Sequence, residues 1–185
     1  MQLIDIDKAR YRKHLNIVIV GFISSLLVMS LLFGTLLISL FSNVGEVTAL
    51  VQATIDSVAE EPETNFSYNL IGVILALVVN GVFLYKVKNS DFFTEIYYVW
   101  RVKQLQNLVY RKFKKIKLAG KNGEETALII LSFYYQSQLQ VYQLDDNTIT
   151  LSTIEKRLQQ LNETIANTGL TISAEQFEKK LIACY

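Results

Sequence analysis

Residues 15–41 form an unbroken run of 27 residues without one charged side chain. About 20 apolar residues in a helix already span the hydrocarbon core of a bilayer. The alternative is a cleaved signal peptide, because four basic residues precede the run. A signal peptide, however, has an apolar region of about 7–15 residues that ends at a small-residue cleavage site. The length of the run therefore favours an uncleaved membrane-spanning helix.

A second run without charge covers residues 66–85, and it is about 30 Å long as a helix, close to one hydrocarbon thickness. The flanking charges predict its orientation. Residues 1–14 carry four Lys and Arg side chains and residues 86–121 carry ten, whereas residues 42–65 carry none. Loops of membrane proteins that are rich in Lys and Arg lie on the cytoplasmic side. We therefore predict a multi-pass protein with both termini in the cytoplasm.

The connecting segment, residues 42–65, is predicted to face the outside and carries five acidic side chains. Its branched apolar residues recur at helical spacing, which indicates a short amphipathic helix at the outer surface. Those residues are Val44, Val47, Val51, Ile55 and Val58. Pro62 is expected to end this helix, because the residue before a proline is biased away from the helical conformation.

Residues 86–185 have the pattern of a cytoplasmic helical domain, with amphipathic helices joined by short turns. The helices are expected at residues 91–118, 124–144 and 152–168, with a short one from residue 173. Ser152 with Glu155, and Ser173 with Gln176, have the spacing of capping boxes, and Gly169 is a natural helix end. The predicted fold class is therefore an all-α membrane protein, a two-helix transmembrane hairpin followed by a cytoplasmic bundle of three to four helices.

Small or amide-bearing residues recur along one side of each predicted span. They are Gly21, Ser25, Ser30, Gly34, Gly72, Ala76 and Asn80. In lipid such residues let helix backbones approach closely, and an asparagine amide can bond across the contact. The favoured interpretation is that they pack the two spans against each other, and the alternative is that they mediate dimerisation or docking to a partner.

Basic side chains follow the second span closely. They include Lys86, Lys88, Arg111, Lys112, Lys114, Lys115 and Lys117. The simplest interpretation is a solvated surface that also orients the protein. Contact with anionic lipid headgroups comes second, because each basic residue near the surface contributes about 1 kcal/mol. Nucleic acid, whose phosphates attract the same charges, comes third.

Aromatic residues cluster just after the second span, namely Phe92, Phe93, Tyr97, Tyr98 and Trp100. Aromatic side chains favour the headgroup region of a bilayer, so we interpret them as an interfacial belt.

No motif indicates catalysis, and we expect no enzyme activity, metal or cofactor. Asp145, Asp146 and Asn147 could contribute oxygen ligands to a divalent cation, but turn formation explains the triplet better. His14 has no Cys or second His near it in sequence with which to form a metal site. The spans lack ionisable side chains, which disfavours an ion or proton pathway.

Four short sequences, in order along most of the chain, resemble a family of small gammaproteobacterial inner-membrane proteins known only as a domain of unknown function. They are YRKHLN at residues 11–16, NLIGV at 69–73, YVWRVKQ at 98–104 and LDDNTI at 144–149. The resemblance implies a bacterial inner membrane. It implies no activity and no catalytic residue.

These observations favour a non-catalytic, membrane-anchored interaction or scaffold protein that acts through its cytoplasmic domain. Its expected partners are a bilayer with anionic headgroups and either another protein or a second copy of the chain. The alternative is a regulator or sensor at the anionic inner leaflet that uses the basic residues after the second span.

Overall fold

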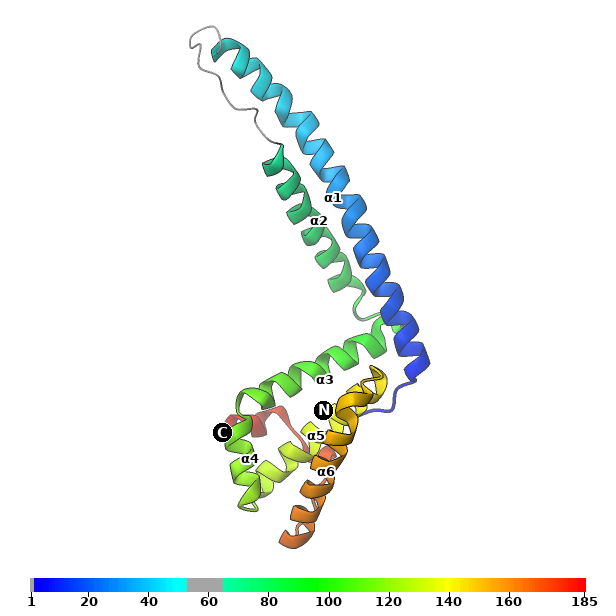
Figure 1. Ribbon diagram of the computed structural model, residues 1–185, viewed down its shortest axis with the longest axis vertical. Coiled ribbons are helices and arrows are strands. Elements are labelled where there is room, and N and C mark those ends of the chain that lie inside the picture. The colour runs from blue at the N-terminus through cyan, green and yellow to red at the C-terminus, as the bar shows by residue number, and fades with distance from the viewer. Residues whose placement is uncertain (1, 53–64) are drawn as a thin grey trace. The chain divides into compact units, whose positions relative to one another are not determined.

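The computed structural model describes residues 2–52 and 65–185, and every regular element within these ranges is a helix (Figure 1). The α-helices are α1 (Lys8–Gln52), α2 (Phe66–Val87), α3 (Thr94–Arg111), α4 (Phe113–Lys121), α5 (Glu125–Leu144) and α6 (Thr148–Thr168). Three short 3-10 helices are η1 (Asp91–Phe93), η2 (Ala174–Gln176) and η3 (Lys179–Cys184).

The chain divides into two compact units. Residues 15–90 form one, which we call the apolar hairpin, and residues 1–14 together with 91–185 form the other, which we call the helical unit. Two helical stretches, Lys8–Phe41 in α1 and the whole of α2, are long and apolar enough to cross a membrane. Their large apolar side chains are largely exposed, as expected for helices that would bury them in lipid.

Helix α1 is longer than the apolar run that predicts it. It begins at Lys8 and continues without interruption to Gln52, so the expected boundary at Ser42 is not a helix end. Of the predicted amphipathic helix in the connecting segment, the part up to Gln52 belongs to α1. The remainder, including Ile55 and Val58, lies outside the described residues.

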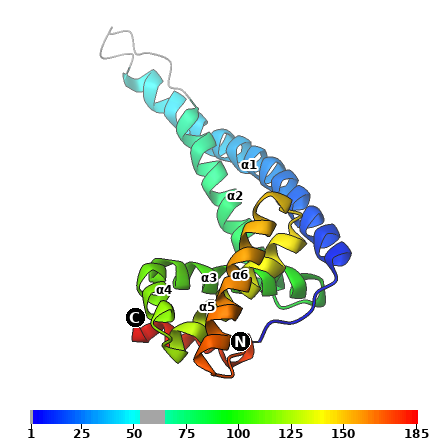
Figure 2. The same ribbon diagram turned by 60° about the horizontal axis from the view of Figure 1, so that its bottom comes forward.

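The centre of the helical unit is α5, which contacts α3, α4, α6, η2 and η3 (Figure 2). Helix α5 takes this position because residues 127–135 are apolar or aromatic on almost every side, which a helix can satisfy only when it is covered all round. Phe133 of α5 lies parallel to Phe177, with ring centroids 3.9 Å apart, and both rings are fully buried.

The single long helix expected at residues 91–118 is wrong, because it is broken into η1, α3 and α4. Lys112 leaves the helical conformation between α3 and α4, with φ −111° and ψ 8°. A straight helix over the whole range would be about 42 Å long, whereas the 20 residues of α5 span about 30 Å. The break at Lys112 lets the chain turn and pack both α3 and α4 against α5.

Helix α6 begins at Thr148, four residues before the expected Ser152, and its N-cap Asn147 makes no side-chain capping bond. The helix starts directly after a tight turn at Asp146, whose φ of 54° is left-handed. The expected end is confirmed, since Gly169 caps the helix at φ 66°. The second capping box, Ser173 with Gln176, is also confirmed, although 3-10 helices rather than an α-helix follow it.

Candidate functional site

The N-terminal segment, residues 2–14, packs onto the rest of the helical unit through polar contacts. The Ile4 backbone N–H donates a hydrogen bond to the Tyr98 hydroxyl (3.0 Å), and the Gln140 amide donates to the Ile4 carbonyl (2.5 Å). Tyr98 in turn donates to the Gln140 side-chain oxygen (3.1 Å). Burial raises the pKa of Tyr98, which keeps the hydroxyl protonated and able to donate. These three hydrogen bonds hold Ile4, which precedes α1 in the chain, against α3 and α5.

Asp145 and Asp146, in the turn between α5 and α6, bind basic and hydroxyl side chains of the same chain. Asp146 pairs with Lys8 and Arg12 of the N-terminal segment. Asp145 accepts hydrogen bonds from the Tyr11 hydroxyl (3.2 Å) and from Lys103 of α3 (2.9 Å). The two carboxylates therefore join the N-terminal segment to the rest of the helical unit. Their place in a tight turn agrees with the turn-forming role that the sequence indicates.

Glu95, near the start of α3, is a third acidic contact for the N-terminal segment. Arg10 pairs with it at 2.9 Å, and the His14 Nδ1 atom lies 3.6 Å from its second carboxylate oxygen. The His14 ring stacks on Phe92, with centroids 4.3 Å apart. Sequence analysis assigned no role to Glu95, because a lone acid in an amphipathic helix carries no signal of its partner.

The basic residues after the second predicted span are divided between the two units. Lys86 and Lys88 belong to the apolar hairpin, where Lys88 lies 3.7 Å above the Tyr85 ring. The other five belong to the helical unit. Arg111 and Lys114 line a cavity of about 710 Å³ beside Tyr110 and Tyr185, together with Lys112 and Lys115.

Lys112 and Lys115 hold the C-terminal end of the chain. The Lys112 ammonium donates to the Ile182 carbonyl (3.0 Å) and Lys115 donates to the Tyr185 carbonyl (3.3 Å). The Tyr185 hydroxyl donates to the Glu124 carboxylate (2.6 Å). Burial, together with this carboxylate, raises the pKa of Tyr185. Lys112 and Lys115 thus bind backbone carbonyls near the C-terminal end, and a membrane contact by the seven basic residues stays a prediction.

The aromatic residues near the start of α3 differ in their surroundings. Tyr98 is buried and binds Ile4, as described above. Trp100 is half exposed and stacks on Tyr97, with centroids 5.6 Å apart, and Phe93 packs edge-on against Phe92. The interior contacts of Tyr98 account for that residue, and an interfacial role for the other four stays a prediction.

Within the apolar hairpin, the small residues of α1 and α2 meet each other. A Cβ atom on Gly72 would lie 2.6 Å from the Gly34 nitrogen and 3.1 Å from the Ser30 carbonyl oxygen. One turn and more along α2, Ala76 and Asn80 are buried, and the Ser25 hydroxyl donates to the Asn80 side-chain oxygen (2.9 Å). The geometry brings six of the seven predicted packing residues together.

Gly21 stands apart from that contact, since a Cβ on it would meet nothing within 4 Å. Asn80 satisfies its amide within the hairpin, because it donates to the Ala76 carbonyl (2.9 Å) and approaches the Met29 sulfur (3.7 Å). A buried amide in an apolar helix is costly without partners, so these bonds explain how the hairpin accommodates Asn80.

The sequence analysis missed a recess that is lined by Lys117, Lys121 and Arg157. The spacing of Lys117 and Lys121, four residues apart on one face of α4, was visible in the sequence. The approach of Arg157 was not, because it depends on how α6 packs. In the part of the chain that the structure describes, no three His, Cys, Asp or Glu side chains are close enough to hold a metal ion.

Comparison with known proteins gives one match. The family model described as "Protein of unknown function (DUF3087)" matches residues 1–182, nearly the whole chain. No curated protein and no solved structure matches the chain.

Proposed function

The chain belongs to the DUF3087 family, whose function is unknown, and we propose that it is a non-catalytic interaction protein anchored in a bacterial inner membrane. The helical unit would lie in the cytoplasm and bind a protein partner or a second copy of the chain. The apolar hairpin would be the anchor that keeps this unit at the membrane surface.

One observation carries the proposal, namely that residues 1–14 and 91–185 form a single compact unit. The chain leaves this unit at the start of the hairpin and returns to it afterwards. This connectivity supports a topology in which both ends of the hairpin lie on the same side of a membrane, as they would in a two-span anchor. Fourteen Lys and Arg side chains flank these ends, in residues 1–14 and 86–121, which supports the cytoplasmic side.

The topology has a direct test in the exposed Cys184, the single cysteine of the chain. In intact spheroplasts, Cys184 should resist a membrane-impermeant maleimide, and it should react once the membrane is permeabilised. A Ser57→Cys variant in a Cys184→Ser background is the matched control and should react in intact spheroplasts. Labelling of Cys184 without permeabilisation would place the helical unit outside and contradict the proposed topology.

The interaction itself is tested at the exposed apolar residues of the helical unit, where a partner would gain most by covering them. Ile149 is 89% exposed and Leu118 is 63% exposed. A photoreactive phenylalanine analogue at either position should cross-link to a discrete product in native membranes, whereas the same analogue at the exposed polar Gln104 serves as control. The proposal is contradicted if both apolar positions give only uncross-linked protein.

A further inference from the structure

A recess in the helical unit carries three cationic side chains. It lies between α4, α5 and α6 and has a volume of about 180 Å³. Its lining is Lys117, Gly120, Lys121, Leu131, Tyr135, Arg157, Gln160, Leu161 and Thr164. No carboxylate is among these lining residues, although acidic and basic residues are nearly equal in number over the whole chain. The recess therefore concentrates positive charge in a concave surface.

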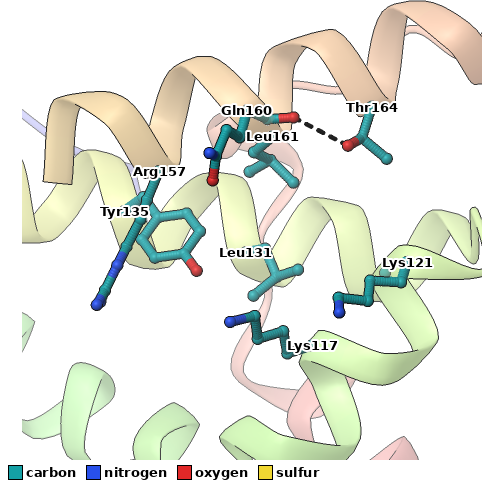
Figure 3. Close-up of a pocket in the computed structure, with 9 residues that line it drawn as sticks. Lys117, Lys121, Leu131, Tyr135, Arg157, Gln160, Leu161 and Thr164 are labelled. Carbon is teal, nitrogen blue, oxygen red and sulfur yellow. Dashed lines mark hydrogen bonds between the residues drawn. The ribbon is translucent and has the colours of Figure 1, made fainter. Parts of the chain in front are cut away.

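The three cations reach the recess from two helices. Figure 3 shows Lys117 and Lys121 on α4, below Leu131, and Arg157 extending from α6 beside the Tyr135 ring. Leu131 and Tyr135, both buried in α5, form the apolar wall between them. The three exposed cations thus line one recess between three packed helices.

Gly120 and the polar face of α6 complete the recess. A Cβ on Gly120 would lie 2.6 Å from a Leu131 methyl group, so the glycine lets α4 approach α5 closely. On α6, Gln160 and Thr164 lie four residues apart and face the same space. The Thr164 hydroxyl donates its proton to the Gln160 carbonyl (2.9 Å), so the Gln160 side-chain amide is the donor that this face offers to an anion.

Among residues 2–52 and 65–185, no carboxylate forms an ion pair with a charge of the recess. Six ion pairs are found in the described part of the chain, and none of them includes Lys117, Lys121 or Arg157. Burial raises the pKa of the Tyr135 hydroxyl, and the positive charge of Arg157 opposes this rise. Three uncompensated cations beside a protonated hydroxyl favour an anionic ligand.

We propose that this recess binds the phosphate group of a small ligand. A phosphate monoester carries nearly two negative charges and three terminal oxygens. It therefore matches two ammonium groups and one guanidinium better than a carboxylate ligand, which has one charge and two oxygens. The planar guanidinium of Arg157 can donate two parallel hydrogen bonds to phosphate, and lysines bind it as point charges. The volume of the recess admits a phosphate with a few attached atoms. A small ligand would thus be added to the protein partner of the proposed function.

The experiment uses the full-length protein in nanodiscs of zwitterionic lipid and titrates two soluble probes by calorimetry. The first probe is inorganic phosphate and the second is a short-chain phosphatidic acid, whose headgroup is a phosphate monoester. Binding of inorganic phosphate identifies a soluble source, and binding of the lipid probe alone identifies a headgroup. Either result supports the site, provided that the combined variant Lys117→Gln, Lys121→Gln, Arg157→Gln weakens the binding by at least about tenfold.

A matched control removes the same amount of charge elsewhere. Arg101→Gln, Lys156→Gln and Lys179→Gln change one arginine and two lysines that are exposed and do not line the recess. This variant should bind the probe within about twofold of the wild type, a free-energy change well under that of a tenfold loss. A milder variant, Arg157→Lys, keeps the charge but loses the planar fork, so it should bind more weakly than wild type while folding normally.

Three results would overturn the proposal. One is that neither probe binds to the wild-type protein. Another is that the Lys117, Lys121, Arg157 variant binds as tightly as wild type. The last is that the control variant loses as much affinity as the recess variant, because the effect would then come from net charge alone. Circular dichroism of each variant establishes that its helices are retained.

Discussion

Gly72→Ala should open the contact between α1 and α2. The added Cβ would lie 2.6 Å from the Gly34 nitrogen and 2.9 Å from the Gly34 Cα. Both are backbone atoms, so no side-chain rotation can relieve the overlap and the helices must move apart. Overpacking of this kind costs about 1–3 kcal/mol, which corresponds to a shift of roughly 5- to 150-fold in the ratio of closed to open hairpin.

The opening can be measured at the far end of the hairpin, where the Phe41 and Tyr68 rings lie 6.4 Å apart. Phe41→Cys and Tyr68→Cys, in a Cys184→Ser background, provide two thiols for a short bifunctional reagent. An engineered protease site within residues 53–64 separates the two helices, so that only cross-linked fragments stay together. Gly72→Ala should reduce the linked fraction several-fold.

Two other glycines provide graded controls for the same measurement. A Cβ on Gly81, also in α2, meets nothing within 4 Å, so Gly81→Ala should give the same cross-linked fraction as the double-cysteine protein without it. A Cβ on Gly34 would meet the Asn69 side-chain oxygen at 2.8 Å, but that oxygen can rotate away, so Gly34→Ala should be intermediate. Equal linking by the Gly72 and Gly81 variants would show that close backbone contact does not hold the hairpin.

The features that sequence analysis predicted are those that depend on neighbouring residues. A run of 27 residues without charge predicts a long apolar helix whatever the rest of the chain does. Gly169 ends α6 because a left-handed residue is needed at that position and glycine adopts this conformation at no steric cost. The Ser173 capping box is likewise complete within four residues. Local chemistry therefore predicts helices and their ends.

The features that sequence analysis missed depend on contacts between distant residues. Asp145 and Asp146 bind residues 8–12, which lie more than 130 positions earlier in the chain. From sequence, the basic N-terminal residues explain only membrane orientation, and the acids explain only a turn. Arg157 lies 36 residues after Lys121, and only the packing of α4 and α6 on α5 brings the two together. Periodicity identifies the helical faces but does not pair them.

Phe177→Ala should give the largest loss of stability in the helical unit. Phe177 is 1% exposed and lies parallel to Phe133, whose ring is fully buried in α5. Truncation of a buried phenylalanine to alanine costs about 3–5 kcal/mol, because the transfer free energy is lost and a cavity remains. The phenylalanine also holds residues 173–185 against α5, so its loss should loosen the backbone of this segment and speed tryptic cleavage at Lys179 and Lys180, whose side chains are already exposed.

Trp100, the single tryptophan, provides the measurement, because it lines the same cavity as Phe177 and lies in the helical unit. Urea titration of the full chain in detergent, followed by its fluorescence, should show a much lower midpoint for Phe177→Ala. Ile149→Ala truncates a residue that is 89% exposed and should change stability by less than about 0.5 kcal/mol. If the two variants unfold at the same urea concentration, the stacked rings do not stabilise the fold, and the C-terminal segment must be held by its polar contacts, from Lys112 to Ile182 and from Tyr185 to Glu124.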